Sequence, residues 1–277
     1  MIQRILLALS LFLAPLTSLA PAQDPAKGFD HSHGAWTKVL EKFSKQDDLD
    51  YAGLKASRAG LDAYLASLES VTSEAFAKWT REQRYAFWIN AYNAYTVQRV
   101  VDHYPVKSIK DIGSIFTKVW DQRFIKLTAL YPAADGKPLS LNDIEHGILR
   151  PEFRDARVHA AVNCASKGCP PLKKTAFTAK DLDSQLDDQV RLWLADPKRN
   201  AFDAKAKHAS VSKIFDWFAE DFKRDGGSLN EWLARYAPKE HQAWLGAAGV
   251  RVSHNDYDWK LNDGSKKSTK KSFGSPR

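Results

Sequence analysis

Two cysteines and a histidine lie close together in VHAAVNCASKGCPPL, residues 158–172, and these are the only cysteines of the chain. Residues of these types support a disulfide bond, a metal site, or a thiol made reactive by a neighbouring base. The loop between Cys164 and Cys169 is short enough for a disulfide to close. Its C-x4-C spacing differs from the C-x-x-C motif of thiol–disulfide exchange. The segment therefore predicts either a structural disulfide or a reactive Cys164.

A zinc site is the weakest of these alternatives. Four residues are candidate ligands, His146, His159, Cys164 and Cys169, but their spacing matches no common zinc motif. The sequence also has no glycine-rich phosphate loop after a strand and no G-x-S-x-G motif. We therefore expect no metal and no cofactor, and we exclude nucleotide chemistry and serine hydrolysis.

The first residues of the chain have the pattern of a secretory signal peptide. Arg4 supplies a positive charge, residues 5–13 form an apolar run too short to span a bilayer, and residues 20–22 read Ala-Pro-Ala, a small-residue cleavage site. We expect residues 1–22 to be removed and the protein to be exported, either to the periplasm or as a secreted protein. Because thiols persist as disulfides in oxidising compartments, export favours a bridged cysteine pair.

The formal net charge of +8 is concentrated at the two ends of the chain. Arg4 and the five basic residues of segment 264–277 account for six of these charges, so residues 23–263 carry only +2. This body lacks the basic stripe that nucleic acid requires, and no second apolar run is long enough for stable membrane insertion. We expect neither partner, and we expect a disordered basic tail at 264–277.

Periodicity and capping signals predict a helix-rich α+β fold. The strongest signal is a helix over 80–105, which opens with a capping box of Thr80 and Gln83 and ends at Pro105. Further helices are predicted at 33–43, 54–68, 140–151, 182–194, 214–222 and 229–236, and extended segments at 123–130, 156–164 and 250–262. These elements predict one domain over 29–263, with a small and mostly antiparallel sheet.

Two asparagines interrupt the apolar face of the helix predicted over 80–105. Asn90 and Asn93 fall on the side that carries Ala86 and Val97. A buried amide without a hydrogen-bond partner costs about 1–3 kcal/mol, so both amides need partners. They are expected either to fix the backbone of a neighbouring loop or, with Asn163, to line a substrate site, as amide donors do in oxyanion sites.

A carboxylate interrupts the apolar face of the helix predicted over 140–151. Ser140 is the expected N-cap of this helix and Pro151 its stop, while Glu145 lies among its apolar residues with His146 at their edge. A carboxylate directed at a core needs a cationic or hydrogen-bonded partner. Glu145 is therefore expected either to pair with a nearby arginine or to orient a histidine.

The strand predicted over 156–164 raises a problem of distance. In a fully extended segment, His159 would lie about 16 Å from Cys164, too far for a hydrogen bond. Two alternatives bring an imidazole to the thiol. Either the strand ends near Val162 and the chain folds back, or His146 is the partner.

Several of these motifs together resemble a known family. The segments FWINAYNAYTVQRVV, YPVKSI, SLNDIEHGILR, VHAAVNCASKGCPPL and YDWKLN are similar, in this order, to the motifs of the domain of unknown function 547 family. The resemblance extends from about residue 85 to residue 262. It implies an exported protein with a fold similar to papain-like and transglutaminase-like cysteine hydrolases, in which a thiol, a histidine and an acid meet in a cleft.

Carried over to this chain, the resemblance implies Cys164 as the thiol, His159 or His146 as the imidazole, and Glu145 as the acid. A neighbouring imidazole generates the thiolate, and a buried acid orients the imidazole. The hypothesis is an exported cysteine-dependent hydrolase or acyl transferase that acts on a small peptide or thiol-peptide amide. The alternative is a non-catalytic periplasmic binding or scaffold module with a structural Cys164–Cys169 disulfide.

Overall fold

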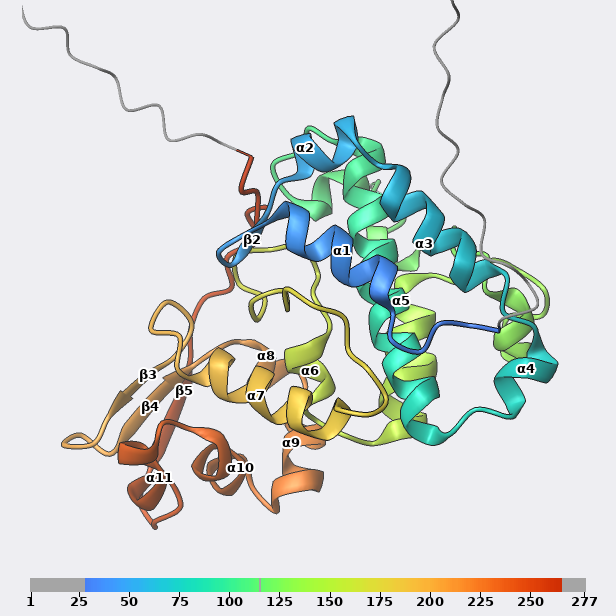
Figure 1. Cartoon of the computed structure of the whole chain (residues 1–277). Coiled ribbons are helices and arrows are strands. Elements are labelled where there is room, and N and C mark those ends of the chain that lie inside the picture. Colours follow the sequence, from blue (N-terminus) through green and yellow to red (C-terminus); the bar gives the residue numbers. More distant parts are fainter. Residues whose placement is uncertain (1–27, 115, 266–277) are drawn as a thin grey trace, which may run out of the picture.

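The computed structural model describes residues 28–114 and 116–265. The predicted signal peptide and residues 266–277 of the predicted tail lie outside these ranges. Helix α5 (Arg81–His103) runs through the N-terminal part of the fold, and the other helices of that part pack around it (Figure 1). They are α1 (Gly34–Phe43), α2 (Tyr51–Ala56), α3 (Ala59–Glu69) and α4 (Ser73–Ala77).

The sequence explains the central place of α5. Both halves of the predicted capping box are present, since Thr80 Oγ1 accepts from Gln83 N at 3.2 Å and Gln83 Oε1 accepts from Thr80 N at 2.9 Å. The helix ends at His103, before Pro105, as predicted. Every residue from 85 to 97 is buried, because this stretch carries aromatic or small side chains on all sides. No helix in the described ranges combines the length and the apolar character needed to span a bilayer.

Short elements connect α5 to the second half of the chain. The 3₁₀ helices are η2 (Ile109–Ile112), η3 (Val119–Asp121), η4 (Thr128–Leu130) and η5 (Pro132–Ala134). The strand predicted over 123–130 is wrong: Ile125 and Leu127 are buried in alternation, but the segment has only one bridge, from Ile125 to Leu139, before it coils into η4. The alternation correctly indicated which side chains are buried, but no partner strand lies alongside.

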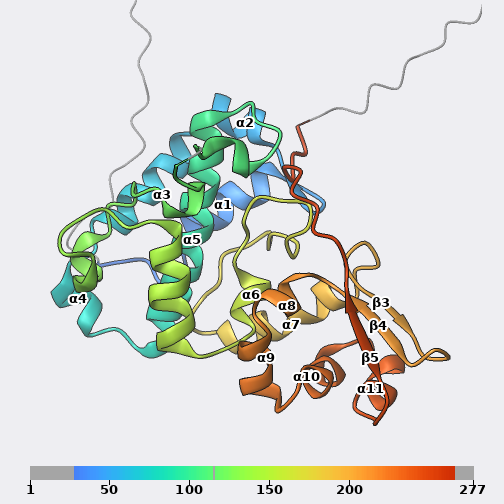
Figure 2. The same ribbon diagram turned by 180° about the vertical axis from the view of Figure 1, so that it is seen from behind.

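The π-helix η6 (Asp143–Phe153) packs beside α5 (Figure 2). Two α-helical residues, 141 and 142, lead into it, and Ser140 caps this helical segment as predicted, since its hydroxyl accepts from Asp143 N at 3.0 Å. Pro151 does not end it and lies inside its last turn. A proline removes one backbone donor, but the wider π turn continues for two residues beyond it.

The C-terminal half forms a second core around a three-stranded sheet. Strands β3 (Ala201–Asp203) and β4 (His208–Val211) are antiparallel, and β5 (Arg251–His254) joins β4 in parallel. A separate antiparallel pair, β1 (Ser44–Lys45) and β2 (Asp48–Leu49), lies in the N-terminal half. The helices of this half are α7 (Leu182–Leu194), α8 (Ile214–Trp217), α9 (Ala219–Gly226), α10 (Leu229–Tyr236) and α11 (Lys239–Leu245). The α+β prediction is confirmed.

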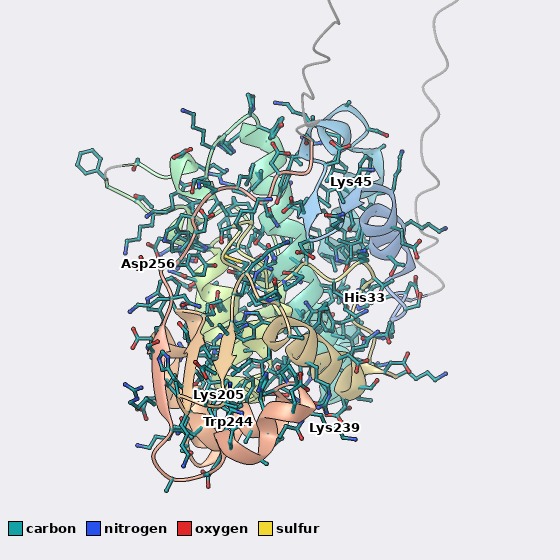
Figure 3. The ribbon with its side chains drawn as sticks, turned by 90° about the vertical axis from the view of Figure 1, so that its left-hand side faces the viewer. His33, Lys45, Lys205, Lys239, Trp244 and Asp256 are labelled. Atoms are coloured by element: carbon teal, nitrogen blue, oxygen red, sulfur yellow. A yellow bond between two sulfur atoms is a disulfide. The ribbon has the colours of Figure 1, made fainter. Side chains whose placement is uncertain are left out.

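Figure 3 shows how the two halves lie relative to each other. Lys45 of β1 lies in the N-terminal half, in the upper part of this view, and Lys205 and Trp244 lie in the C-terminal half, in the lower part. The segment after β5 passes from one half to the other, because Leu261 bridges to Ser166 and Asp263 to Leu49. It carries Tyr257 across the boundary between the two cores.

The segment 156–164 is a one-turn helix, α6 (Val158–Ala161), and the predicted strand is wrong. Asp155 holds the turn that leads into the helix, since its Oδ1 accepts from Arg157 N at 3.0 Å and its carbonyl from Val158 N at 3.1 Å. Val158 and Ala161 belong to the first core, whereas Ala156 and Ala160 belong to the second. The small apolar residues resembled a buried strand, but here they allow the two cores to pack against this turn from two sides. His159 therefore lies at their boundary.

Candidate active site

A cavity of about 170 Å³ is lined by residues of η6, α6, α8 and the segment after β5. Four predicted site residues line it, Glu145, His146, His159 and Cys164, with Cys169 beside them. The remaining lining residues are Asn142, Val162, Ile214 and the aromatic side chains Tyr92, Trp120, Trp217, Phe218, Tyr257 and Trp259. Because residues 158–161 form a helical turn and not an extended strand, His159 and Cys164 both line this cavity despite the distance expected for a strand.

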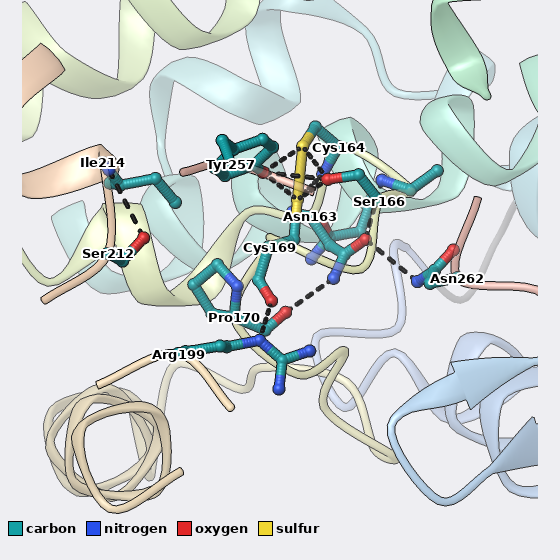
Figure 4. Close-up of a disulfide and its surroundings, with 12 residues drawn as sticks. Asn163, Cys164, Ser166, Cys169, Pro170, Arg199, Ser212, Ile214, Tyr257 and Asn262 are labelled. Carbon is teal, nitrogen blue, oxygen red and sulfur yellow. Dashed lines mark hydrogen bonds between the residues drawn. A yellow bond between two sulfur atoms is a disulfide. The ribbon is translucent and has the colours of Figure 1, made fainter. Parts of the chain in front are cut away.

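Cys164 and Cys169 form a disulfide in the wall of this cavity (Figure 4). Their Cα atoms are 6.3 Å apart; Cys169 is buried and Cys164 is half-buried. The Tyr257 hydroxyl lies 3.0 Å from Cys164 Sγ and 3.1 Å from Cys169 Sγ. Ser166 Oγ donates to the same hydroxyl at 2.9 Å. The reactive-thiol hypothesis therefore requires that this bond be reduced first.

The loop between the cysteines is held by Asn163 and by a close aromatic contact. Asn163 Oδ1 accepts from Ala165 N at 2.8 Å, and its Nδ2 donates to Pro170 O at 2.8 Å. The Tyr257 ring packs directly on Gly168, where a Cβ atom would come within 2.9 Å of the ring. Glycine is thus needed at 168 for the tyrosine to reach the disulfide.

His159 is almost fully buried and is hydrogen-bonded to Asp221 of α9, with Nε2 and Oδ2 2.8 Å apart. Its ring stacks on Phe218, with centroids 4.0 Å apart and planes 16° apart. Asp221 also accepts from Arg150 Nε at 2.7 Å and from Arg224 Nη1 at 2.9 Å. These contacts fix the imidazole in one orientation. Its Nδ1 has no hydrogen-bond partner among the described residues.

The electrostatics of this pair favour a neutral histidine. Burial lowers the pKa of His159 below its ordinary value, and the carboxylates of Asp221 and Glu145 offset this only in part. Burial tends to raise the pKa of Asp221, but hydrogen bonds from His159 and Arg150 outweigh it and hold that pKa well below the ordinary range. Anionic Asp221 accepts a hydrogen bond from the Nε2–H group of His159. The proton of the neutral ring therefore lies on Nε2, and Nδ1 carries the lone pair and can act as a base.

Glu145 borders the cavity but has no hydrogen bond to His159 in the described part of the chain. Asp221 is the acid that contacts the imidazole. Arg150, one of the arginines near Glu145, pairs with Asp221 instead. Burial raises the pKa of Tyr92, and the nearby charge of Glu145 raises it further.

His146, the second candidate imidazole, lies at the exposed edge of the cavity. Arg150 Nη1 and His146 Nδ1 are 3.2 Å apart, an arrangement in which the guanidinium donates. The ring centroids of His146 and Phe218 are 6.0 Å apart. Unlike His159, His146 has no acid partner among the described contacts, so His159 is the better placed base.

The three asparagines fix backbone and do not line the cavity. Asn90 exchanges two hydrogen bonds with the backbone of Phe177, at 2.7 and 3.0 Å. Asn93 Nδ2 donates to Ala161 O at 2.9 Å, and its Oδ1 accepts from Asn163 N at 2.8 Å. The contacts of Asn90 and Asn93 are those of the loop-fixing alternative, while a substrate-binding role of the three amides stays a prediction. Through Asn93, helix α5 positions the end of α6 and the start of the cysteine loop.

Asn93→Ala is expected to lower the free energy of unfolding by roughly 2–4 kcal/mol, because it leaves one buried carbonyl and one buried N–H without partners. The measurement is urea denaturation of the oxidised protein. Gln98→Ala on the same helix is the control and is expected to change stability little, since Gln98 is half-buried and makes no side-chain hydrogen bond among the described residues. Equal losses in the two variants would contradict the positioning role of Asn93.

Part of the chain matches a known protein family. Residues 76–194 match the family described as a protein of unknown function, DUF547. The match confirms the family resemblance for four of the five motifs; the fifth, YDWKLN at 257–262, lies outside the matched residues. It includes α5, η6, α6 and the cysteine loop, and it ends with α7, before the segments that carry Asp221 and Tyr257. No curated protein and no solved structure matches the chain.

Two site residues, Asp221 and Tyr257, were missed by the sequence analysis. Asp221 had a usable signal: it lies three residues after Phe218 and seven after Ile214, on the apolar side of the predicted helix 214–222. The same test identified Glu145. Tyr257 had only a weak signal, its presence in the YDWKLN motif, because its contact with the disulfide spans 93 residues of sequence.

Proposed function

We propose that this protein is an exported cysteine-dependent hydrolase or acyl transferase that acts on a small peptide or thiol-peptide amide. Cys164 would be the nucleophile, His159 its base and Asp221 the residue that orients the base. The observation that carries the proposal is that His159, which is hydrogen-bonded to the buried Asp221, lines the same cavity as Cys164. A nucleophile, a base and an orienting acid are the three parts that acyl transfer to cysteine needs.

The proposed reaction follows from these positions. His159 Nδ1 takes the proton of the reduced Cys164 thiol, and the thiolate attacks the carbonyl carbon of the amide. The C–N bond breaks as the imidazolium returns the proton to the leaving amine, which leaves a thioester on Cys164. Water, or an acceptor amine in a transferase, then attacks the thioester and frees the thiol.

Tyr257 supports the thiolate in this scheme. Burial raises the pKa of Tyr257 and outweighs the opposing effect of the hydrogen bond from Ser166, so the phenol stays protonated at neutral pH. A neutral hydroxyl 3.0 Å from Cys164 Sγ can donate to a thiolate at that position. Removal of the Tyr257 hydroxyl is expected to make the Cys164 thiolate less stable relative to the thiol, while His159 remains as the base.

The closed disulfide supports two interpretations of the resting protein. In the first it is a lock: one dithiol, or two molecules of a small monothiol, supply two electrons and two protons, are oxidised to a disulfide, and free both cysteines. In the second it is a permanent structural link in a binding or scaffold module, which is the alternative function. The two interpretations predict opposite responses to mild reductant.

Cys164→Ala is expected to abolish hydrolysis of a library of fluorogenic peptide amides by the reduced protein. Cys169→Ala is the matched control: it cannot form the disulfide, so it should be active without reductant. The oxidised natural protein should be inactive until a dithiol is added. Activity that persists in Cys164→Ala would contradict the proposal. A disulfide that resists dithiol, together with an inert Cys169→Ala protein, would favour the binding module.

A further inference from the structure

Four aromatic side chains form a continuous wall on one side of the cavity. Tyr257 and Trp259 have ring centroids 4.5 Å apart, Trp217 and Tyr257 4.8 Å, and Trp120 and Trp259 5.4 Å. Trp217 is 45 % exposed, which is unusual for so large an apolar side chain. Aromatic faces arranged around a space attract cations through the negative faces of their rings, and such cages bind ammonium groups.

Trp259 already shows this kind of contact. The Lys110 ammonium lies 4.9 Å from the centre of its ring, and Lys110 is not among the residues that line the cavity. The rings of Trp217 and Tyr257 have no such cation among the described residues. They remain available to a ligand inside the cavity.

Glu145 provides the carboxylate that would pair with a cationic ligand. Its side chain lines the cavity and is only 8 % exposed, yet it has no ion pair within the described ranges. The other buried carboxylate of the site, Asp221, is compensated by Arg150 and Arg224. A buried carboxylate that faces a cavity without a cation is a binding position for one.

We propose that the cavity recognises an alkylammonium group, held between the carboxylate of Glu145 and the wall formed by Trp217, Tyr257 and Trp259. The inference deepens the proposed function and rests on it: the amide substrate would carry a positive charge close to the scissile bond. Two sources supply that chemistry, the α-ammonium of a peptide N-terminus and the ammonium of a lysine-type side chain. Substrates with a carboxylate at this position are excluded by repulsion from Glu145.

The test measures binding alone, by calorimetric titration of the oxidised protein, in which Cys164 cannot react. Alaninamide and N-acetylalaninamide form one pair of ligands, and N-acetyl-lysinamide and N-acetylnorleucinamide form the other. In each pair only the first carries an ammonium group. We expect at least tenfold tighter binding of the charged ligand in one pair, at about 0.1 M salt so that long-range attraction is screened. The pair that shows the preference identifies the source of the ammonium.

Two variants connect this preference to the named residues. Glu145→Gln keeps the shape of the side chain and is expected to remove the preference, whereas Trp217→Leu should weaken the charged ligand at least threefold and the neutral one little. Glu69→Gln is the control, because Glu69 accepts from the hydroxyl of Tyr95, as Glu145 does from that of Tyr92, but lies outside the cavity. If Glu145→Gln does not fold, Trp217→Leu decides the question.

Equal binding of charged and neutral ligands, or a preference that survives in both variants, would overturn the proposal. This outcome is separate from failure of the proposed function, because binding is measured on a protein without a free thiol. If Cys164 is active but binding shows no ammonium preference, the hydrolase proposal stands and the proposed substrate class is wrong. If binding shows a clear ammonium preference but Cys164 is inert, the ammonium site stands and the protein is better described as the binding module.

Discussion

His159→Gln is expected to lower the turnover of the reduced protein by roughly 10²–10⁴-fold, the usual contribution of a general base. Glutamine can still donate to Asp221, so the change removes the proton acceptor and leaves the hydrogen bond that holds α6 to α9. Without a base, Cys164 must react through the small thiolate fraction of an ordinary thiol, whose pKa is about 8.5. The loss should therefore appear in the rate constant of the chemical step.

A measurement that needs no substrate checks the same prediction. In the Cys169→Ala background, the rate of Cys164 alkylation by iodoacetamide is followed against pH. With His159 present, the midpoint of this curve is expected at least one unit below about 8.5, the value for an ordinary thiol, and with Gln at 159 it should return to that value. His146→Gln is the matched control and should leave the curve unchanged. If His146→Gln moves the midpoint and His159→Gln does not, the base is assigned to the wrong histidine.

The elements with strong local signals could be predicted from the sequence. The capping box at Thr80 and the turn before Pro105 bound α5 through contacts between near neighbours, so no tertiary information was needed. The helices α7 and α10 follow the same logic, with a single apolar face over each predicted range. The helix predicted over 214–222 was nearly right, but it breaks at Phe218 into α8 and α9.

The site itself depended on contacts that local pattern does not encode. Small and β-branched residues at 156–164 fit a buried strand, yet here they let α6 contact two cores at once. The hydrogen bond between His159 and Asp221 joins residues 62 positions apart. Sequence reasoning offered Glu145 as the acid because it interrupts an apolar helix face and lies in a motif that resembles the family. The anomaly of a buried carboxylate was correctly detected at 145. Its partner could not be named without the arrangement of α6, α9 and η6.

Asp221→Asn is expected to lower the free energy of unfolding by about 3–5 kcal/mol, the usual cost of removing one partner from a buried ion pair. Asp221 accepts from His159, Arg150 and Arg224, and it is 7 % exposed. An asparagine offers one acceptor oxygen, and its NH₂ group would face donors. Arg150 then loses its counter-charge, whereas Arg224 keeps its second partner, Asp225, and His159 loses its acceptor at a nearly inaccessible position. Asp216→Asn in the neighbouring helix is the control: Asp216 is exposed and pairs only with Lys213 at the surface, so little change is expected.

The stability lost on replacing Asp221 is expected to depend on pH in a definite direction. The pKa of Asp221 in the folded protein lies below the ordinary value of about 3.9, so its contribution to stability is complete above that pH and is lost as pH falls below it. Burial also lowers the pKa of His159, so both proteins lose stability as pH falls below about 6.5. Denaturant titrations at pH 7, 5 and 3 separate the two effects, because only the Asp221 contribution makes the difference between natural protein and variant shrink between pH 5 and 3. A difference that stays constant down to pH 3 would mean that the carboxylate charge of Asp221 does not hold α6, η6 and α9 together, and that His159 owes its orientation to packing on Phe218 instead.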